Sequence, residues 1–447
     1  MENLRQTLIR VADGIRNHRI TKAALEATWP GLATLLCGDQ IEQKIDEFIA
    51  KHEDQHEEIL GLLRKVLENA NHDSPGDYVI AIGSSNIEYV LWVDKVEVGL
   101  KHSIREAAEY VGGSGLNYVS RMLSCGMRAY PVLSTGEDER GEKIRQHILD
   151  IAQGRGDSHN VITFLDPSNF FAPKMKTPGT TIVVDGTRRT IFSQQPGGMD
   201  EFANFAKARL KAIKTLEEKD PGAVMIGHLY CDYEDEATGK IGGECTKYLI
   251  SRYKDDALVF TNFGGTQFKL GSDFWAEDIA NVGVFQLSLD EARAFFSGNG
   301  VSKSLVDMIE WFRERNVTAV VTLDKFGAVA TYKGDDEDLI IAWPFDIENI
   351  VDTTGAGDAF GAGLVSQLIG KPDFQWGDLC EAVRKAREWA AYACTTPGGC
   401  ANCPDKQALT MFNKILNTQA RIAPVQKVAL EAALPILRLF DRAYPPI

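Results

Sequence analysis

Short apolar runs alternate with longer stretches of helical periodicity after residue 76, and this alternation constrains the fold of the chain most strongly. The apolar runs are Tyr78–Gly83, Gly222–Gly227, Ala257–Thr261 and Ala319–Thr322. Runs of this length between helices indicate buried strands of a mostly parallel sheet. In such a sheet, ligands bind beyond the carboxyl ends of the strands.

A glycine-rich segment, Asp352–Phe360, leads into a run of small and apolar residues that Gly370 and Pro372 terminate. We expect a helix that begins near Gly355, because the periodicity starts there. The first amides of a helix have no intrahelical acceptor and lie at its positive end, so they hold an anion well. Asp358 at the same place predicts a base that takes a proton while a phosphoryl group is transferred. A helix-capping aspartate in a glycine-rich turn is the alternative.

Three segments in order resemble the ribokinase-like (phosphofructokinase-B type) sugar and nucleoside kinases. Asp352–Phe360 is similar to the family's C-terminal signature, and Val111–Gly141 is similar to its N-terminal signature. Between them, Ala319–Ala328 resembles the strand and turn that touch nucleotide phosphates. The resemblance implies an α/β fold of three layers, α/β/α, with a mostly parallel central sheet and a small β lid over the acceptor.

We expect three parts along the chain. Residues 1–75 show helical periodicity among many charges and form an N-terminal helical extension. Residues 76–405 form the kinase domain, with lid strands within about 88–112 and 178–194, the second pair turning at Asp185-Gly186. Residues 406–447 form a helical tail.

The resemblance implies the role of each site residue. Asp358 is the catalytic base, and Gly355, Ala356 and Gly357 form the anion hole. The acceptor is held by Asn86, Glu88, Gly112, Gly113 and Asn117. The nucleotide is held by Thr322, Asp324, Gly327, Ala393 and Gly398. Glu291 organises Mg²⁺ through water, with a solvated glutamate at a helix start as the alternative. In many relatives the loop around Asp352 and Thr354 holds a monovalent cation such as K⁺, which is left open here.

Three positions depart from the family pattern. Ser288 stands where the family has asparagine, and Asp324 stands where it has glycine, which places a negative charge near polyphosphate. Glu88 replaces the aspartate that binds the sugar in the family, and its extra methylene extends the carboxylate into the pocket. These departures concern nucleotide affinity and the choice of acceptor.

Rival motifs are weaker. His52-Glu53-Asp54-Gln55-His56 matches the zinc-binding H-E-x-x-H pattern, but its charged surroundings favour a solvated helical face. Gly298–Ser304 resembles a phosphate-binding loop but has Ser302 where the glycine before the lysine is required. Cys400 and Cys403 form a C-x-x-C pair without a second pair, which we interpret as a loop coincidence.

The function expected is ATP- and Mg²⁺-dependent phosphorylation of a hydroxymethyl group on a sugar or sugar-containing small molecule. The alternatives are a nucleoside kinase, an inactive binding or regulatory protein, and a zinc-dependent hydrolase that uses His52 and His56. The net charge of −15 disfavours nucleic acid and anionic membranes as partners. No apolar run is long enough to span a bilayer and no signal pattern is present, so a cytoplasmic protein is expected. A homodimer through the lid is left open.

Overall fold

The computed structural model describes residues 76–443 apart from 98, 155–158, 186–187, 195–200, 236–239, 243, 298–302, 346, 348–349, 401–402 and 419–424, together with parts of residues 4–63. The chain divides into two compact units, residues 1–76 and residues 77–447. Among the described residues, no helix is long and apolar enough to cross a membrane.

The first unit is helical in its described part. It contains α3 (Leu32–Leu36) and α4 (Ile41–Lys51). A small apolar core of its own includes Leu8, Leu32 and Ile45. The H-E-x-x-H match, interpreted above as a solvated helical face, begins directly after α4. His52 is a turn residue, and its Nδ1 lies 3.1 Å from Gln55 Oε1. Glu53 and His56 lie outside the described residues.

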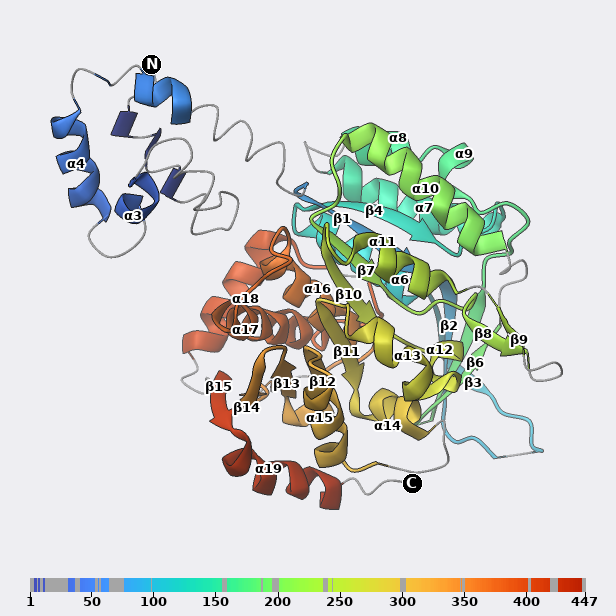
Figure 1. Ribbon diagram of the computed structural model, residues 1–447. Helices are drawn as coiled ribbons and strands as arrows, with labels where there is room; N and C mark the ends of the chain where they lie inside the picture. The colour runs from blue at the N-terminus through green and yellow to red at the C-terminus, as the bar shows by residue number, and fades with distance from the viewer. Residues whose placement is uncertain are drawn as a thin grey trace. The chain divides into compact units, whose positions relative to one another are not determined.

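The second unit is built on a nine-stranded sheet with the order β15-β14-β13-β12-β11-β10-β7-β1-β4 (Figure 1). From β4 to β12 every neighbouring pair is parallel, and β13, β14 and β15 continue the sheet in antiparallel pairs. Its strands are β1 (Tyr78–Gly83), β4 (Arg128–Leu133), β7 (Ala223–Ile226), β10 (Leu258–Asn262), β11 (Val284–Ser288), β12 (Ala319–Thr322), β13 (Ala328–Tyr332), β14 (Asp335–Ala342) and β15 (Val425–Ala429). The predicted mostly parallel sheet is confirmed, because buried apolar runs such as β1 occupy its centre.

Helices cover the sheet and complete three layers, as expected. One group packs together and against strands of the sheet: α6 (Ser114–Ser124), α16 (Ala356–Leu368), α17 (Trp376–Ala393) and α18 (Lys406–Thr418). The other helices are α7 (Glu139–Gln153), α8 (His159–Phe164), α9 (Pro167–Phe170), α10 (Phe202–Glu217), α11 (Cys245–Tyr253), α12 (Thr266–Lys269), α13 (Gly271–Ile279), α14 (Leu289–Ser297), α15 (Leu305–Glu314) and α19 (Leu430–Ala443). The phosphate-loop look-alike lies mainly outside the described residues, and its last residue, Ser304, caps α15 in a capping box with Asp307.

A second sheet has the order β3-β2-β5-β6 and consists of β2 (Asn86–Val93), β3 (Ile104–Gly112), β5 (Gly179–Asp185) and β6 (Arg188–Ser193). β5 and β6 pair antiparallel with Asp185 opposite Arg188. This is the small β sheet that the family resemblance implies. A separate pair joins β8 (Tyr233–Asp235) to β9 (Lys240–Gly242).

The C-terminal tail differs from the expected helical segment. Residues 425–429 form β15, which pairs antiparallel with β14 and so becomes the outermost strand of the central sheet. α19 then packs on α15, β14 and β15. A strand at the sheet edge is half exposed and carries Gln426 and Lys427, so its sequence lacks the continuous apolar run of the central strands.

Candidate functional site

The predicted helix start lies where the sequence places it. α16 begins at Ala356, and Gly355 caps it with φ of 71°, a left-handed conformation that favours glycine. A β carbon on Gly355 would lie 2.8 Å from the Gly399 backbone, so the two loops can approach only because residue 355 is glycine. The Ala356 N–H donates to Thr353 O at 3.2 Å. The amides of Gly357 and Asp358 belong to the first helical turn, where the helix itself offers no acceptor.

Asp358 is partly buried in this first turn and contacts a residue of the other signature. Asn117, in α6, donates its Nδ2 to Asp358 Oδ2 at 2.6 Å. The two predicted site residues therefore meet although they lie on different helices. Gln286 also contacts this helix end, because its Nε2 donates to Gly357 O at 2.8 Å.

Tyr118, next to Asn117, was not identified from the sequence. Its ring is buried against Phe260 with ring centroids 5.8 Å apart. Burial raises the pKa of Tyr118 far above its usual value, and the charges of Asp358 and Glu291 raise it further. The hydroxyl thus lies in the field of both carboxylates and stays protonated.

The predicted acceptor-binding residues gather where β2 and β3 begin and end. Asn86 is paired with Gly112 in the β2–β3 register. Glu88 is buried, and a β carbon on Gly112 would lie 2.4 Å from Glu88 Oε1, so this carboxylate rests directly on Gly112. Asn86 Nδ2 donates to Thr180 Oγ1 of β5 at 2.7 Å. Gly113 is the N-cap of α6, and Asn117 follows it four residues later, at the end of the first helical turn.

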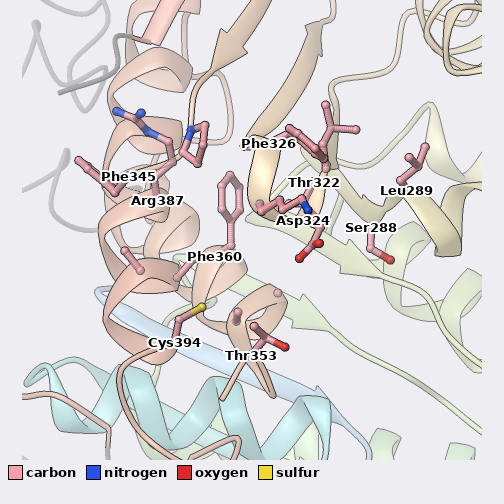
Figure 2. A pocket seen from close by; sticks show the side chains of 18 of the residues that line it. Ser288, Leu289, Thr322, Asp324, Phe326, Phe345, Thr353, Phe360, Arg387 and Cys394 are labelled. Atoms are coloured by element: carbon pink, nitrogen blue, oxygen red, sulfur yellow. The ribbon is translucent and has the colours of Figure 1, made fainter. Parts of the chain in front are cut away.

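A pocket of about 470 Å³ lies at the start of α16, and Ala356 and Gly357 line it. Thr322, Asp324 and Gly327, which the sequence analysis assigns to the nucleotide, line it as well. Figure 2 shows Ser288, Thr322 and Asp324 on one side of this pocket and Phe345 and Arg387 on the other. The pocket thus runs from an acidic end to a basic and aromatic end.

Two predicted nucleotide residues are not among those that line this pocket. Ala393 and Gly398 are buried, and the Gly398 N–H donates to Asp352 Oδ2 at 3.0 Å. The described residues that line the pocket from this segment are instead Ala390, Ala391 and Cys394. The helical spacing explains the difference, because Ala391 and Cys394 share one face of the end of α17 and Ala393 faces the core.

The pocket is also lined by Phe345, Arg387 and Phe440, which no motif of the sequence indicates. The Arg387 guanidinium donates from Nη1 to Trp343 O, and its carbon lies 4.7 Å from the centre of the Phe345 ring. Desolvation lowers the pKa of Arg387 to about 10. Phe440 comes from α19 and packs on Phe326 with ring centroids 5.5 Å apart. The tail therefore supplies part of the pocket wall.

Glu291 lies at a helix start, as its alternative role predicts, and the Mg²⁺ role stays a prediction. It lies in the first turn of α14, where the Ser288 N–H donates to Glu291 Oε2 at 2.7 Å and the Glu291 N–H donates to Ser288 Oγ at 3.3 Å. Its other oxygen, Oε1, lies 3.8 Å from His228 Nε2. The carboxylate is thus oriented by a cap and still partly exposed, at 27% of its side chain. A carboxylate held in this way fits a hydrated Mg²⁺.

The loop of Asp352 and Thr354 is closed by side-chain bonds. Asp352 Oδ1 accepts from the Thr354 N–H at 2.9 Å and from the Thr354 hydroxyl at 2.8 Å. Asp352 Oδ1 therefore holds its own loop, and Asp352 Oδ2 holds the segment of Gly398 through the Gly398 N–H. Any cation in this loop would be held by backbone carbonyls rather than by these side chains.

Of the two cysteines in the C-x-x-C pair, Cys400 is buried and Cys403 is partly exposed. Cys400 Sγ lies 3.3 Å from Val111 O, whereas Cys403 Sγ lies 3.4 Å from Cys400 O. Within the described part of the chain, no group of three or more His, Cys, Asp or Glu residues could hold a metal ion.

The profile of the pfkB family carbohydrate kinases matches residues 273–406. A relative from Dictyostelium discoideum, described as an uncharacterized sugar kinase, is 29% identical over 144 residues, which cover 30% of this chain and 39% of that protein.

Solved structures resemble the fold over most of the chain. Ribokinase from Arabidopsis thaliana, complexed with ribose and ATP, is 15% identical, with a TM-score of 0.51 and coverage of 76% of this chain and 99% of that chain. The nucleoside kinase of Burkholderia thailandensis, in complex with inosine, is 14% identical, with a TM-score of 0.54 and coverage of 76% and 97%. The fold and the profile match confirm the resemblance drawn from the sequence.

Proposed function

Because the chain belongs to the ribokinase-like (pfkB) family, we propose that it transfers the γ-phosphoryl group of ATP to a hydroxymethyl group of a sugar or sugar-containing small molecule. One observation carries this proposal. Asp358, hydrogen-bonded to Asn117, stands in the first turn of α16. The two residues before it, Ala356 and Gly357, line the pocket of about 470 Å³. The positively polarised end of α16 therefore borders the pocket, and the proton acceptor follows the lining residue Gly357 directly in the chain.

In the proposed reaction, Asp358 takes the proton of the acceptor hydroxyl as its oxygen attacks the γ-phosphorus in line. The amides at the start of α16 stabilise the negative charge on the transferring group, because they point toward it before the reaction begins. Asn117 keeps the Asp358 carboxylate oriented through the bond to Oδ2. Glu291 would hold Mg²⁺ through water, and the ion would neutralise the phosphate oxygens.

The acceptor side supports a polyhydroxylated molecule. Asn86 and Glu88 offer an amide and a carboxylate beside Gly112, and Asn117 offers an amide beside Asp358. Such groups bond hydroxyls in several directions. A nucleoside is the second candidate, because its ribose presents the same hydroxymethyl group and the related fold of the Burkholderia enzyme is found in complex with inosine.

The test measures ATP consumption against a panel of pentoses, hexoses and nucleosides. We expect turnover with at least one of them, and we expect Asp358→Asn to reduce kcat by about 10² to 10⁴ while nucleotide binding, measured by calorimetry, stays within a few-fold. Undiminished turnover of the Asp358→Asn variant would remove the base role. Nucleotide binding without turnover of any acceptor would favour the binding or regulatory alternative.

Two further expectations belong to this proposal. A monovalent cation held by carbonyls near Asp352 and Thr354 should make activity higher in K⁺ than in Na⁺ at equal ionic strength.

A homodimer through the lid is supported by exposed apolar side chains on β3 and β6, of which Ile104 and Phe192 are 54% and 61% exposed. Light scattering should give twice the monomer mass, and a monomeric mass at high protein concentration would contradict the dimer.

A further inference from the structure

His228 lies beyond the carboxyl end of a central strand, at the edge where parallel sheets of this kind bind their ligands. It follows β7, which stands between β1 and β10 in the central sheet, and its backbone N–H donates to Ser114 Oγ at 2.8 Å. Ser114 begins α6, the helix that also carries Asn117. On its other side, His228 Nε2 lies 3.8 Å from Glu291 Oε1. The imidazole therefore stands between the acceptor-side helix and the carboxylate assigned to the phosphate side.

The ring is held in one position by its surroundings. A β carbon on Gly264 would lie 2.4 Å from ring atoms of His228, so the ring rests on the glycine backbone. Its Nε2 lies 3.1 Å from Asn262 Oδ1 at the end of β10. Two contacts from a neighbouring strand and its loop thus fix a side chain that is still 33% exposed.

The hydrogen bonds also fix the tautomer. A backbone carbonyl only accepts, so Asn262 must donate its Nδ2 to Gln286 O, which lies 3.1 Å away. Asn262 Oδ1 is then the acceptor toward His228, and His228 Nε2 carries the proton. In the neutral ring, Nδ1 is consequently an acceptor. Within the described residues no partner for Nδ1 is found, and His228 does not line the nucleotide pocket.

We infer that His228 is a specificity residue for the acceptor, and that its Nδ1 accepts a hydrogen bond from a hydroxyl other than the one phosphorylated. The inference rests on the proposed kinase function and deepens it. An acceptor nitrogen held this firmly selects for a molecule with a hydroxyl at that point. It selects against a deoxy analogue, because the nitrogen would then lose its water without gaining a partner.

The test compares the wild type with His228→Gln on ribose and inosine and on their 2- and 3-deoxy forms. Glutamine retains an amide that can donate to Asn262 and lacks the Nδ1 acceptor. We expect KM for the hydroxylated acceptor to rise about tenfold or more, with kcat and KM for ATP changed less than threefold. The wild type should discriminate against one deoxy form, and His228→Gln should lose that discrimination.

Two more variants keep the result interpretable. His159→Gln changes an exposed histidine of α8 and should leave every constant unchanged. Gly264→Ala pushes the His228 ring from its place without removing it, and should raise the same KM if His228→Gln fails to fold. Unchanged discrimination between hydroxylated and deoxy acceptors in an active, folded variant would overturn the inference. A wild type that phosphorylates none of these acceptors would instead count against the proposed function.

Discussion

Asn117 and Asp358, 241 residues apart in the chain, are joined by a hydrogen bond of 2.6 Å from Nδ2 to Oδ2. The bond brings together the two segments that resemble the family signatures. It also makes Asn117 a donor to the proposed base, in addition to its expected contact with the acceptor.

Asn117→Ala should therefore lower kcat as well as raise KM for the acceptor. A hydrogen bond to a charged group contributes about 1.5–3 kcal/mol, so we expect a loss of roughly 10- to 100-fold in kcat/KM. Steady-state kinetics on the best acceptor will measure it. A change in KM alone would mean that the bond to Asp358 has no part in the chemical step.

Glu291→Gln should raise the Mg²⁺ concentration needed for half-maximal activity by roughly tenfold, because the amide keeps the acceptor for the Ser288 N–H but loses the negative charge. Calorimetry of ATP binding with and without Mg²⁺ gives a readout that is independent of turnover. Glu310→Gln, an exposed glutamate of α15, is the matched control. Equal Mg²⁺ dependence in both variants would leave Glu291 as a helix cap.

Asp324→Gly should strengthen the binding of ATP. Asp324 has φ of 53°, a conformation that suits glycine, and its carboxylate lines the pocket near Thr322. Removing one negative charge from the polyphosphate end should lower KM for ATP by roughly fivefold. A higher KM would show that Asp324 binds the nucleotide, directly or through a cation.

Phe440→Ala should weaken nucleotide binding by roughly tenfold, since an aromatic wall of the pocket is lost. Leu439→Ala alters the neighbouring residue, which is 62% exposed, and should have little effect. Titration with a fluorescent ADP analogue compares the two variants. If both behave as the wild type, the C-terminal helix does not contribute to the nucleotide site.

The local parts of the site were predictable from the sequence, and the parts made by distant residues were not. The four consecutive residues Gly355 to Asp358 predict a helix start, and α16 begins there. His228 follows β7 and Asn262 is the last residue of β10, and only the order of β7 and β10 in the sheet brings them together. No local pattern carries that information.

The C-terminal part shows the same division. The apolar period of Leu430, Leu437 and Phe440 indicates a helix, and α19 is that helix. β15 was missed because an edge strand needs little apolar character on its exposed face. Arg387 lies on α17, and its position beside Phe345 depends on the path of the chain after β14, which no local pattern of the sequence indicates.

The place of β15 has a consequence for how this unit is assembled. The strand pairs with β14, so that Val425 meets Ala342 and Ala429 meets Asp338, across more than eighty residues of intervening chain. During synthesis from the N-terminus, the edge of the sheet and the Phe440 wall can be added only after that long stretch has emerged. Until then β14 presents unpaired backbone groups, and we expect a ribosome-bound chain that ends before β15 to need protection from association with other chains.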